Sequence, residues 1–396
     1  MSNQPMAARI TDLSLSMRPF IRFYRESSYM RLAAEPDICD FAIGNPHNLP
    51  LPEYVSSLQQ HIQPQNKDWF AYKMSEPASQ RTVAATLREW RGIDFDPDDI
   101  SMTNGGFAAI AVSLFALVDP GDEVIFITPP WFFYELLITQ AQGIAVRVPI
   151  NTATFDLDLD AIAAAITPRT RAIIINSPNN PTGKIYGAET LQGLAAILTE
   201  ATERNGRTIY LLSDEAYSRI VYDSRPFHSA TAYYPHSLML YTYGKTLLTP
   251  GQRIGYIALP PMMPEAERVA LREGILVAQL AQSYAFPNAL LQHALPDLEK
   301  QSIDIEQLQA KRNRLVGALR EIGYDVHLPE GTFYLLPRSP IADDWAFMEI
   351  LAQHKILALP GKVVELPGYF RLSLTASEEM IERSLSRFAA AFEQAG

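Results

Sequence analysis

Short apolar runs alternate with longer helical patterns through the middle of this chain, from about residue 100 to residue 290. Three of the runs, at residues 123–127, 171–176 and 208–213, are rich in β-branched and aliphatic residues, which is typical of strands buried on both faces. A helical pattern such as that of residues 188–203 lies between successive runs. This alternation predicts an α/β fold in which helices cover a mostly parallel sheet.

The pattern changes after about residue 290. Residues 305–322 have a helical pattern that ends at Gly323, and short strand patterns follow near residues 324–328 and 332–336. Ser377 is a favourable N-cap for a last helix, because acidic residues follow it in the first turn. The C-terminal part therefore has the character of a smaller α+β domain.

The length of 396 residues corresponds to two or three structural units at roughly 150 residues each. We expect a large domain over residues 46–290. We expect the smaller domain to combine residues 1–45 with residues 291–396.

The charge and the cysteine content restrict the partners and the compartment. With 33 basic and 44 acidic side chains, the formal net charge is −11, which argues against nucleic-acid or membrane partners because these need clustered Lys and Arg. The longest nearly apolar stretch, residues 107–118, is shorter than the roughly 20 residues that span a bilayer. Residues 1–20 lack the pattern of a signal peptide, and the single cysteine, Cys39, fits a reducing compartment. We expect a cytoplasmic protein.

Several common kinds of site find no match in the sequence. The seven histidines form no pair at metal-ligand spacing and one cysteine cannot build a zinc site, so we expect no metal. Lys245 lies in a Gly-Lys-Thr sequence that resembles the end of a phosphate-binding P-loop, but Met239 stands where that motif needs glycine.

Polar residues and glycines gather where the predicted strands end, which is where open α/β sheets bind ligands. Gly105 and Gly106 precede the apolar helical run, and two glycines at the start of a helix let backbone N–H groups close on a phosphate. The loop at residues 176–183 follows one buried strand, and Asp214 follows the next. Each feature alone is also typical of an ordinary turn or of a capped strand end.

Lys245 ends an aromatic stretch, and Arg253 follows eight residues later. A lysine in an apolar setting has a lowered pKa, which is the condition for a nucleophilic amine. By itself, this lysine fits an ordinary surface position better.

Together and in this order, these motifs resemble those of the fold-type I pyridoxal-phosphate (PLP) enzymes, specifically the class I/II aminotransferase family, which is aspartate aminotransferase-like. The resemblance extends from about Phe41 to Leu374. It is carried by Asn-Pro-Thr-Gly at residues 180–183, Asp-Glu-x-Tyr at residues 214–217, Lys245 with Arg253, and Tyr-Phe-Arg-Leu-Ser at residues 369–373. It implies a fold-type I PLP transferase fold, a PLP cofactor, an amino acid and a 2-oxo acid as substrates, and a homodimer.

The resemblance also implies roles for individual residues. Lys245 matches the catalytic lysine that forms the internal aldimine with PLP and then moves the substrate's α-proton. Asp214 matches the carboxylate that pairs with the pyridinium nitrogen, and Tyr217 and Asn180 match the pair that hydrogen-bonds the 3′-oxygen of PLP. Trp131 matches the aromatic residue that stacks on the pyridine ring.

The phosphate group and the substrate have their own expected ligands. By the same resemblance, the phosphate is bound by Gly105, Gly106, Phe107, Thr242 and Arg253. Arginine suits that task because its planar fork binds two oxygens and stays charged. The residues expected to bind the substrate are Gly44, Asn180 and Arg371, of which Arg371 clamps the α-carboxylate.

The sequence departs from the family pattern at three positions. Tyr72 matches the tyrosine that donates its hydroxyl to the phosphate of the neighbouring subunit, but no glycine turn follows it and the spacing to Arg81 is shorter. Phe107 stands where Ser or Thr is common and leaves only a backbone donor there. Gly244 replaces a small hydroxyl residue before Lys245.

The function implied is the transfer of an amino group between an L-amino acid and a 2-oxo acid in two half-reactions. A PLP-dependent lyase, cyclase or oxidase uses the same cofactor ligands, so it remains an alternative. A ligand-sensing regulator would need a DNA-binding domain, for which about 40 residues before the fold are too few. The sequence does not identify the substrate, because Phe132, Phe133 and Tyr284 fit an apolar pocket and ordinary core packing equally.

Overall fold

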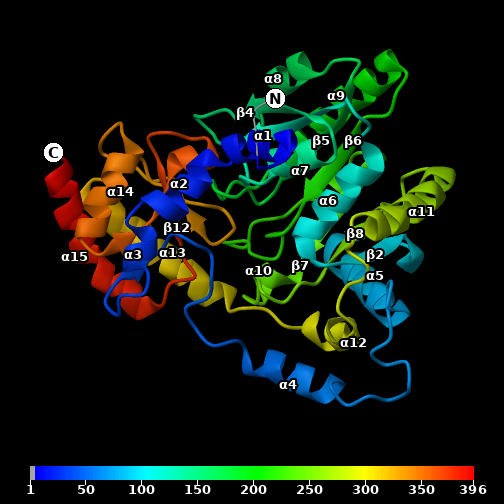
Figure 1. Ribbon diagram of the computed structural model, residues 1–396, viewed down its shortest axis with the longest axis horizontal. Helices are drawn as coiled ribbons and strands as arrows, with labels where there is room; N and C mark the ends of the chain where they lie inside the picture. Colours follow the sequence, from blue (N-terminus) through cyan, green and yellow to red (C-terminus); the bar gives the residue numbers. More distant parts are fainter. Residues whose placement is uncertain (1–4) are drawn as a thin grey trace.

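The computed structural model describes residues 5–396. A seven-stranded sheet in the order β2-β8-β7-β6-β5-β3-β4 organises the larger part of the molecule (Figure 1). Its strands are β2 (Ile100–Thr103), β3 (Glu123–Thr128), β4 (Ile144–Pro149), β5 (Thr170–Asn176), β6 (Tyr210–Asp214), β7 (Ser237–Thr242) and β8 (Gly255–Ala258). Only β8 runs antiparallel to its neighbours, so the predicted α/β fold with a mostly parallel sheet is confirmed.

The central strands are buried on both faces because their alternating side chains enter two separate cores. In β5, Ala172 and Ile174 pack into a core that also contains apolar residues of α6 (Gly105–Leu117), α7 (Tyr134–Gln140) and α11 (Glu265–Ala281). Ile173 and Ile175 point the other way, toward α8 (Leu159–Ala165) and α9 (Ala188–Asn205). Helices therefore cover both faces of the sheet.

Four further helices complete the larger part. They are α4 (Pro52–His61), α5 (Pro77–Arg91), the single turn α10 (Tyr243–Thr246) and α12 (Ala289–Leu298). Helix α12 packs against α4 and α5, at the edge of the sheet formed by β2. Two short 3-10 turns, η1 (Pro97–Asp99) and η2 (Ala230–Ala232), connect elements of this part.

The C-terminal part has its own core beside the sheet (Figure 1). Its elements are α13 (Ile305–Ile322), β9 (Tyr334–Leu335), α14 (Asp344–Gln353), β10 (Ile356–Leu357), β11 (Leu359–Pro360), η3 (Gly361–Val364), β12 (Phe370–Ser373) and α15 (Glu378–Ala395). Strands β11, β12 and β9 form an antiparallel sheet, and β10 pairs with β1 (Cys39–Asp40). The helix predicted to end at Gly323 is confirmed, as is Ser377 as an N-cap, since its hydroxyl accepts a hydrogen bond from the backbone N–H of Met380.

The prediction of a strand near residues 324–328 was wrong. That segment makes only an isolated bridge between Val326 and Pro337, and the strand predicted at residues 332–336 is two residues long. The reason lies in the next residues, whose backbone groups bond to distant loops. The N–H of Gly331 donates to the carbonyl of Gly183, and the carbonyl of Glu330 accepts from Tyr222.

Three N-terminal helices, which the sequence analysis did not predict individually, lie across the two parts of the molecule (Figure 1). They are α1 (Ala8–Ser16), α2 (Arg18–Glu26) and α3 (Tyr29–Leu32). Helix α1 contacts α7 of the larger part, whereas α2 contacts η3 of the C-terminal part. Within residues 5–396, no helix combines the length and the apolar character needed to cross a membrane.

Candidate active site

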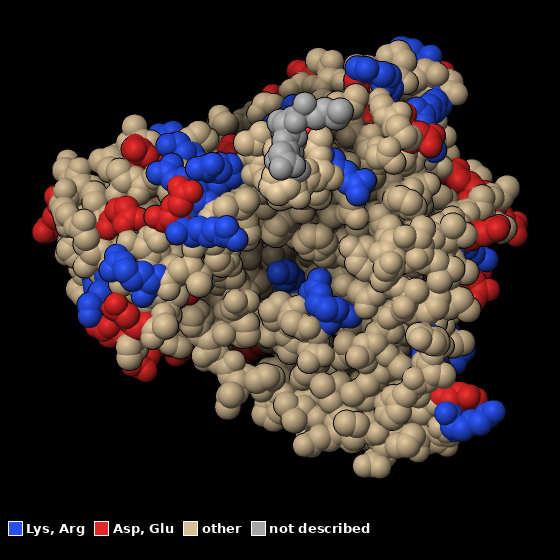
Figure 2. Space-filling model, viewed as in Figure 1, with Lys and Arg blue, Asp and Glu red and all other residues tan. Residues whose placement is uncertain are grey.

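A cavity of about 360 Å³ opens between the two parts of the molecule, at the carboxyl ends of β5, β6 and β7. Figure 2 shows a hollow at the centre of this face, with basic side chains among mostly uncharged atoms. The cavity brings together eleven of the residues predicted from the sequence. They are Gly44, Gly106, Phe107, Trp131, Asn180, Asp214, Tyr217, Thr242, Lys245, Arg253 and Arg371.

Asp214 is the last residue of β6, and its side chain is buried. The hydroxyl of Tyr134 donates a hydrogen bond of 2.6 Å to its carboxylate, and the backbone N–H of Ala216 donates another of 3.2 Å. Burial raises the pKa of Asp214, while the Tyr134 hydrogen bond and the positive charge of Lys245 act in the opposite direction. The site thus holds a fixed acceptor suited to a cationic ring N–H.

Lys245 projects from α10, the single helical turn that follows β7. Its Nζ lies 5.7 Å from the ring centroid of Tyr217 and 5.9 Å from that of Phe333. No residue in the described part of the chain accepts a hydrogen bond from this amine or pairs with it. A half-buried amine on an aromatic floor, facing a cavity, is available to react with a carbonyl compound.

Gly244 has a steric reason to stand where the family usually has a hydroxyl residue. A Cβ at this position would lie 3.1 Å from the Cα of Pro250 and 3.4 Å from the carbonyl oxygen of Thr249. A side chain here would therefore require the loop that follows Lys245 to shift by a few tenths of an ångström.

The start of α6 forms an anion cradle together with Arg253 and Thr242. Gly105 has a positive φ of 77°, and a Cβ there would lie 3.0 Å from Nη2 of Arg253. A Cβ on Gly106 would lie 3.3 Å from the Cβ of Thr242. Backbone N–H groups at a helix start, a hydroxyl and a guanidinium are the donors that bind a phosphate, so this corner fits one.

Arg371 lies in β12 and is only 3% exposed. Its Nη1 donates to Oδ1 of Asn180 and its Nη2 to the carbonyl of Ala42, each at 3.1 Å. Its Nε is buried without a hydrogen-bond partner, and no carboxylate among residues 5–396 pairs with the guanidinium. Since a buried charge needs a counter-charge, this arginine is suited to bind a carboxylate from a ligand.

Tyr334 is a cavity residue that the sequence analysis missed. Its ring lies beneath the guanidinium of Arg371 and meets the ring of Tyr217 edge-on, at a centroid distance of 6.0 Å. Burial acts to raise its pKa, but the nearby groups, chiefly the positive charges of Arg371 and Lys245, outweigh burial and lower the pKa. The pKa of Tyr217 is raised well above its ordinary value, chiefly by burial.

Gly44 makes room for Tyr334. A Cβ on Gly44 would lie 2.5 Å from the hydroxyl oxygen of Tyr334 and 2.8 Å from a ring carbon of Phe333. The N-terminal segment can therefore run over the cavity only because this residue has no side chain.

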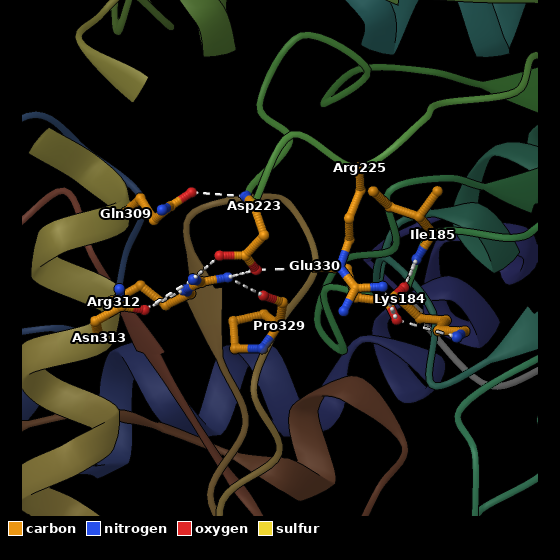
Figure 3. A network of polar contacts seen from close by, with 9 residues as sticks. All are labelled: Lys184, Ile185, Asp223, Arg225, Gln309, Arg312, Asn313, Pro329 and Glu330. Carbon is orange, nitrogen blue, oxygen red and sulfur yellow. Dashed lines mark hydrogen bonds and ion pairs between the residues drawn. The ribbon is translucent and has the colours of Figure 1, made fainter. Parts of the chain in front are cut away.

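A polar network holds the loop of Pro329 and Glu330, which leads into β9 and its Tyr334 (Figure 3). Glu330 accepts hydrogen bonds from Nζ of Lys184 at 3.2 Å and from the backbone N–H of Ile185 at 2.9 Å, and Arg225 pairs with it at 3.4 Å. These partners belong to the segments that follow β5 and β6.

The other side of the same loop is held by Arg312 from α13, which is 1% exposed. Its guanidinium donates to both carboxylate oxygens of Asp223, at 2.8 and 2.7 Å, and to the carbonyl of Pro329 at 2.9 Å (Figure 3). The two parts of the molecule thus meet in charged contacts at this loop.

Aromatic side chains line the remaining wall of the cavity. Trp131, Phe132 and Phe133 come from the segment between β3 and α7, whereas Phe20 and Tyr24 come from α2 and were missed by the sequence analysis. A helix of unpredicted position offers no sequence signal that its aromatic residues reach a distant cavity. Tyr284, expected either in a pocket or in the core, packs on the core beside α6 and α11.

Two predicted residues do not line the cavity. Gly105 lies behind it, in contact with Arg253. Tyr72 lies on the surface and is 91% exposed, beside the exposed Phe70 and Met74. Its role toward a neighbouring subunit stays a prediction.

Comparison with known proteins agrees with this geometry. Residues 36–388 match the family model described as aminotransferase class I and II. The chain is 31% identical over 360 residues to the aspartate/prephenate aminotransferase of Thermus thermophilus, covering 89% of this chain and 90% of the relative. It is 28% identical over 368 residues to a probable aspartate aminotransferase of Methanocaldococcus jannaschii, covering 91% and 95%.

Solved structures agree as well. An amino transferase from Eubacterium rectale superposes with a TM-score of 0.90 at 28% identity over 100% of both chains. The Thermus thermophilus aspartate aminotransferase with maleate gives a TM-score of 0.82 at 27% identity, covering 98% of this chain and 100% of the other. The chain therefore belongs to the class I and II aminotransferases, a PLP-dependent family, and is an aminotransferase.

Proposed function

We propose that this aminotransferase binds PLP in the cavity and exchanges amino groups between an L-amino acid and a 2-oxo acid there. The observation that carries the proposal is the meeting, in one cavity, of the amine of Lys245, the buried carboxylate of Asp214 and the anion cradle beside Arg253. PLP requires three kinds of group: an amine for its aldehyde, an acceptor for its ring N–H and a cradle for its phosphate. When bound, PLP supplies an aldehyde that bonds to amines and a ring that accepts electrons from the substrate.

The residues that would hold each part of the cofactor follow from their chemistry. The cradle of Gly105, Gly106, Phe107, Thr242 and Arg253 would bind the phosphate. Asp214 would pair with the ring nitrogen, held in place by Tyr134. Tyr217 and Asn180 would hydrogen-bond the ring oxygen, and Trp131 would cover the ring face.

Lys245 would serve as the base that moves the substrate's α-proton. Its Nζ takes the proton from the substrate Cα in one direction and returns it in the other. The rings of Tyr217 and Phe333 cover one side of this amine and reduce its contact with solvent, which limits exchange of the transferred proton.

Arg371 would bind the α-carboxylate of both substrates. Two of its nitrogens are already bound to Asn180 and Ala42, which fixes the plane of the guanidinium. Its unpaired Nε and missing counter-charge leave binding capacity for a carboxylate. The ring of Tyr334 supports the other face of this plane.

We further propose a homodimer in a cytoplasmic location. Phe70, Tyr72 and Met74 are exposed on one short segment, and a second copy would cover this apolar patch while receiving the hydroxyl of Tyr72 at its phosphate. The buried single thiol of Cys39 suits a reducing compartment.

The division into domains follows from the cores. Residues 46–290 would form the large domain, and residues 1–45 and 291–396 the small one, since Cys39 and Phe41 share a core with α13 and α15.

The test locates the cofactor and the amine together. Purified protein reconstituted with PLP is treated with borohydride and digested, and we expect mass spectrometry to find the pyridoxyl group on the peptide of Lys245. Addition of an amino acid before borohydride should prevent that labelling, and a 2-oxo acid should restore it. The variant Lys245→Ala should lose turnover, whereas Lys300→Ala, which changes an exposed lysine, should keep it.

Two results would contradict the proposal. Steady-state transamination retained by Lys245→Ala would remove the lysine from the mechanism. Release of ammonia from an amino acid without any 2-oxo acid acceptor would assign lyase or oxidase chemistry to the site.

A further inference from the structure

The charges that line the cavity are few, and each has a task in the proposed function, on which this inference rests. Among the described residues, the cationic side chains of the lining are Lys245, Arg253 and Arg371. They are assigned to the amine chemistry, the phosphate and the α-carboxylate. No further cation of this chain therefore lines the cavity to bind a second carboxylate in the side chain of a substrate.

The uncharged part of the lining contains a connected set of aromatic rings. The ring of Phe20 stacks on Phe132 at a centroid distance of 4.9 Å and meets the edge of Phe133 at 5.4 Å. Phe133 lies 5.3 Å from Phe107 and 5.2 Å from Trp131. All five rings line the cavity, although Phe20 is separated from the others by more than eighty residues of sequence.

The same wall continues to the substrate clamp. The ring of Tyr24 lies 4.8 Å from that of Phe20, one turn away on α2. Burial and the negative charge of Asp40 raise the pKa of Tyr24, while the nearby charge of Arg371 lowers it. A substrate whose α-carboxylate is bound by Arg371 therefore has an aromatic surface beside its side chain.

We infer that this cavity selects amino acids with a large uncharged side chain, aromatic ones first, over dicarboxylic amino acids. A side-chain carboxylate placed against these rings would lose its water without gaining a partner, which is unfavourable. A phenyl ring would instead pack on Phe20, Phe132 and Phe133 in the offset or edge geometry that aromatic rings prefer. Phe20 and Tyr24 precede residue 36, where the family match begins, so this part of the wall lies outside the matched region.

The wild-type holoenzyme provides the first test. Rates of the half-reaction with L-phenylalanine, L-aspartate and L-alanine are measured by the change in cofactor absorbance. We expect kcat/KM for phenylalanine to exceed that for aspartate by on the order of 100-fold, a ratio within reach of an apolar pocket. A higher value for aspartate would overturn the inference and leave the proposed function intact, whereas no reaction with any amino acid would contradict the proposed function itself.

A binding measurement on the same protein is independent of turnover. 3-Phenylpropanoate and succinate are compared as competitive inhibitors and by calorimetry. The inference expects 3-phenylpropanoate to bind at least about tenfold more tightly, because it offers one carboxylate and a ring. Tighter binding of succinate would show that a second cation serves the pocket and would overturn the inference.

Variants of the wall test which residues carry the selectivity. Phe20→Ala and Phe132→Ala should each lower kcat/KM for phenylalanine more than for alanine, by a difference of at least about tenfold. Phe20→Arg should raise the value for aspartate relative to phenylalanine. Phe115→Ala is the matched control, because Phe115 is exposed on α6 away from the cavity, and it should leave the ratios unchanged. Equal losses for all three substrates in the wall variants would mean that these rings only support the fold.

Discussion

The guanidinium of Arg371 lies on the ring of Tyr334, with its Cζ 4.1 Å from the ring centroid. The two residues come from the adjacent strands β12 and β9, which pair in register one residue away, at Leu372 and Leu335. The same ring also meets the ring of Tyr217 edge-on, at a centroid distance of 6.0 Å. One side chain therefore connects the carboxylate clamp with the phenol expected at the cofactor.

Replacing Tyr334 by leucine should weaken substrate binding. A buried cation on an aromatic ring gains about 1–2 kcal/mol, so we expect KM for the amino acid to rise on the order of tenfold. Tyr334→Phe keeps the ring and loses only the hydroxyl in the cavity beside Tyr217, so it should retain KM while kcat falls. The measurement is steady-state kinetics with a single amino acid.

The control for this pair lies outside the cavity. Arg338 has its Cζ 5.4 Å from the ring centroid of Tyr369, which gives a similar arrangement at an isolated bridge outside β9 and β12. Tyr369→Leu should leave KM unchanged. A KM equal to that of the wild type in Tyr334→Leu would remove the ring from the clamp.

The acid limb of the pH profile should depend on Tyr134. Its hydroxyl donates to Asp214 and stabilises the ionised carboxylate, opposing the burial that raises the pKa. In Tyr134→Phe the pKa of Asp214 should rise further. As the pH is lowered, activity that needs the ionised carboxylate should therefore be lost at a higher pH than in the wild type. A hydrogen bond to a charged group contributes about 1.5–3 kcal/mol, which corresponds to about one to two pH units on the acid limb of kcat/KM.

Tyr234→Phe is the control for the loss of a buried phenol. Its hydroxyl donates to the carbonyl of Ile209 at 2.7 Å, away from the cavity. This variant should lose some stability and keep the pH profile. An unshifted acid limb in Tyr134→Phe would show that Asp214 does not need its hydrogen bond.

The residues that sequence reasoning identified are those whose motifs are local. Lys245 with Arg253, and Asp214 with Tyr217, lie within a few residues of each other at the ends of strands whose apolar pattern is plain. A buried strand sets where its last residue emerges, so the strand pattern alone brings such residues to one edge of the sheet.

Tyr134 and Tyr334 could not be found in that way. In the sequence, Tyr134 follows a run of aromatic residues and is therefore indistinguishable from a core residue. In the structure it is indeed buried, with 2% of its surface exposed. Its bond to Asp214 spans eighty residues and depends on how α7 packs on the sheet. The pairing of β1 with β10, and the position of α2 over the cavity, depend on tertiary packing in the same manner.

Gly44 should tolerate no side chain. In Gly44→Ala the new Cβ would overlap the hydroxyl of Tyr334 and the ring of Phe333. Overpacking of this kind costs about 1–3 kcal/mol, and here we expect the displacement of Tyr334 to lower kcat/KM by on the order of 10- to 100-fold. Gly274→Ala is the matched control, because its Cβ would meet open space on α11, and it should keep activity. Full activity in Gly44→Ala would mean that the N-terminal segment can move away from the cavity.

The contact between Arg312 and Asp223 should make the stability of the protein depend on pH. The hydrogen bonds from Arg312 are the main cause that lowers the pKa of Asp223, with burial acting against them. A carboxyl whose folded pKa is lowered stabilises the fold above the ordinary value of about 3.9, and this stabilisation is lost as the pH falls through the lower folded pKa. Asp223→Asn should therefore lower Tm at neutral pH and reduce the further loss of Tm on acidification. In the control Asp94→Asn, which changes an exposed partner of Arg88, the acid dependence of Tm should match the wild type.

The same variant should also affect substrate binding. Because Arg312 also holds the carbonyl of Pro329, Asp223→Asn should raise KM through the loop that leads to Tyr334. An unchanged KM together with a lowered Tm would confine this contact to stability and separate it from the clamp.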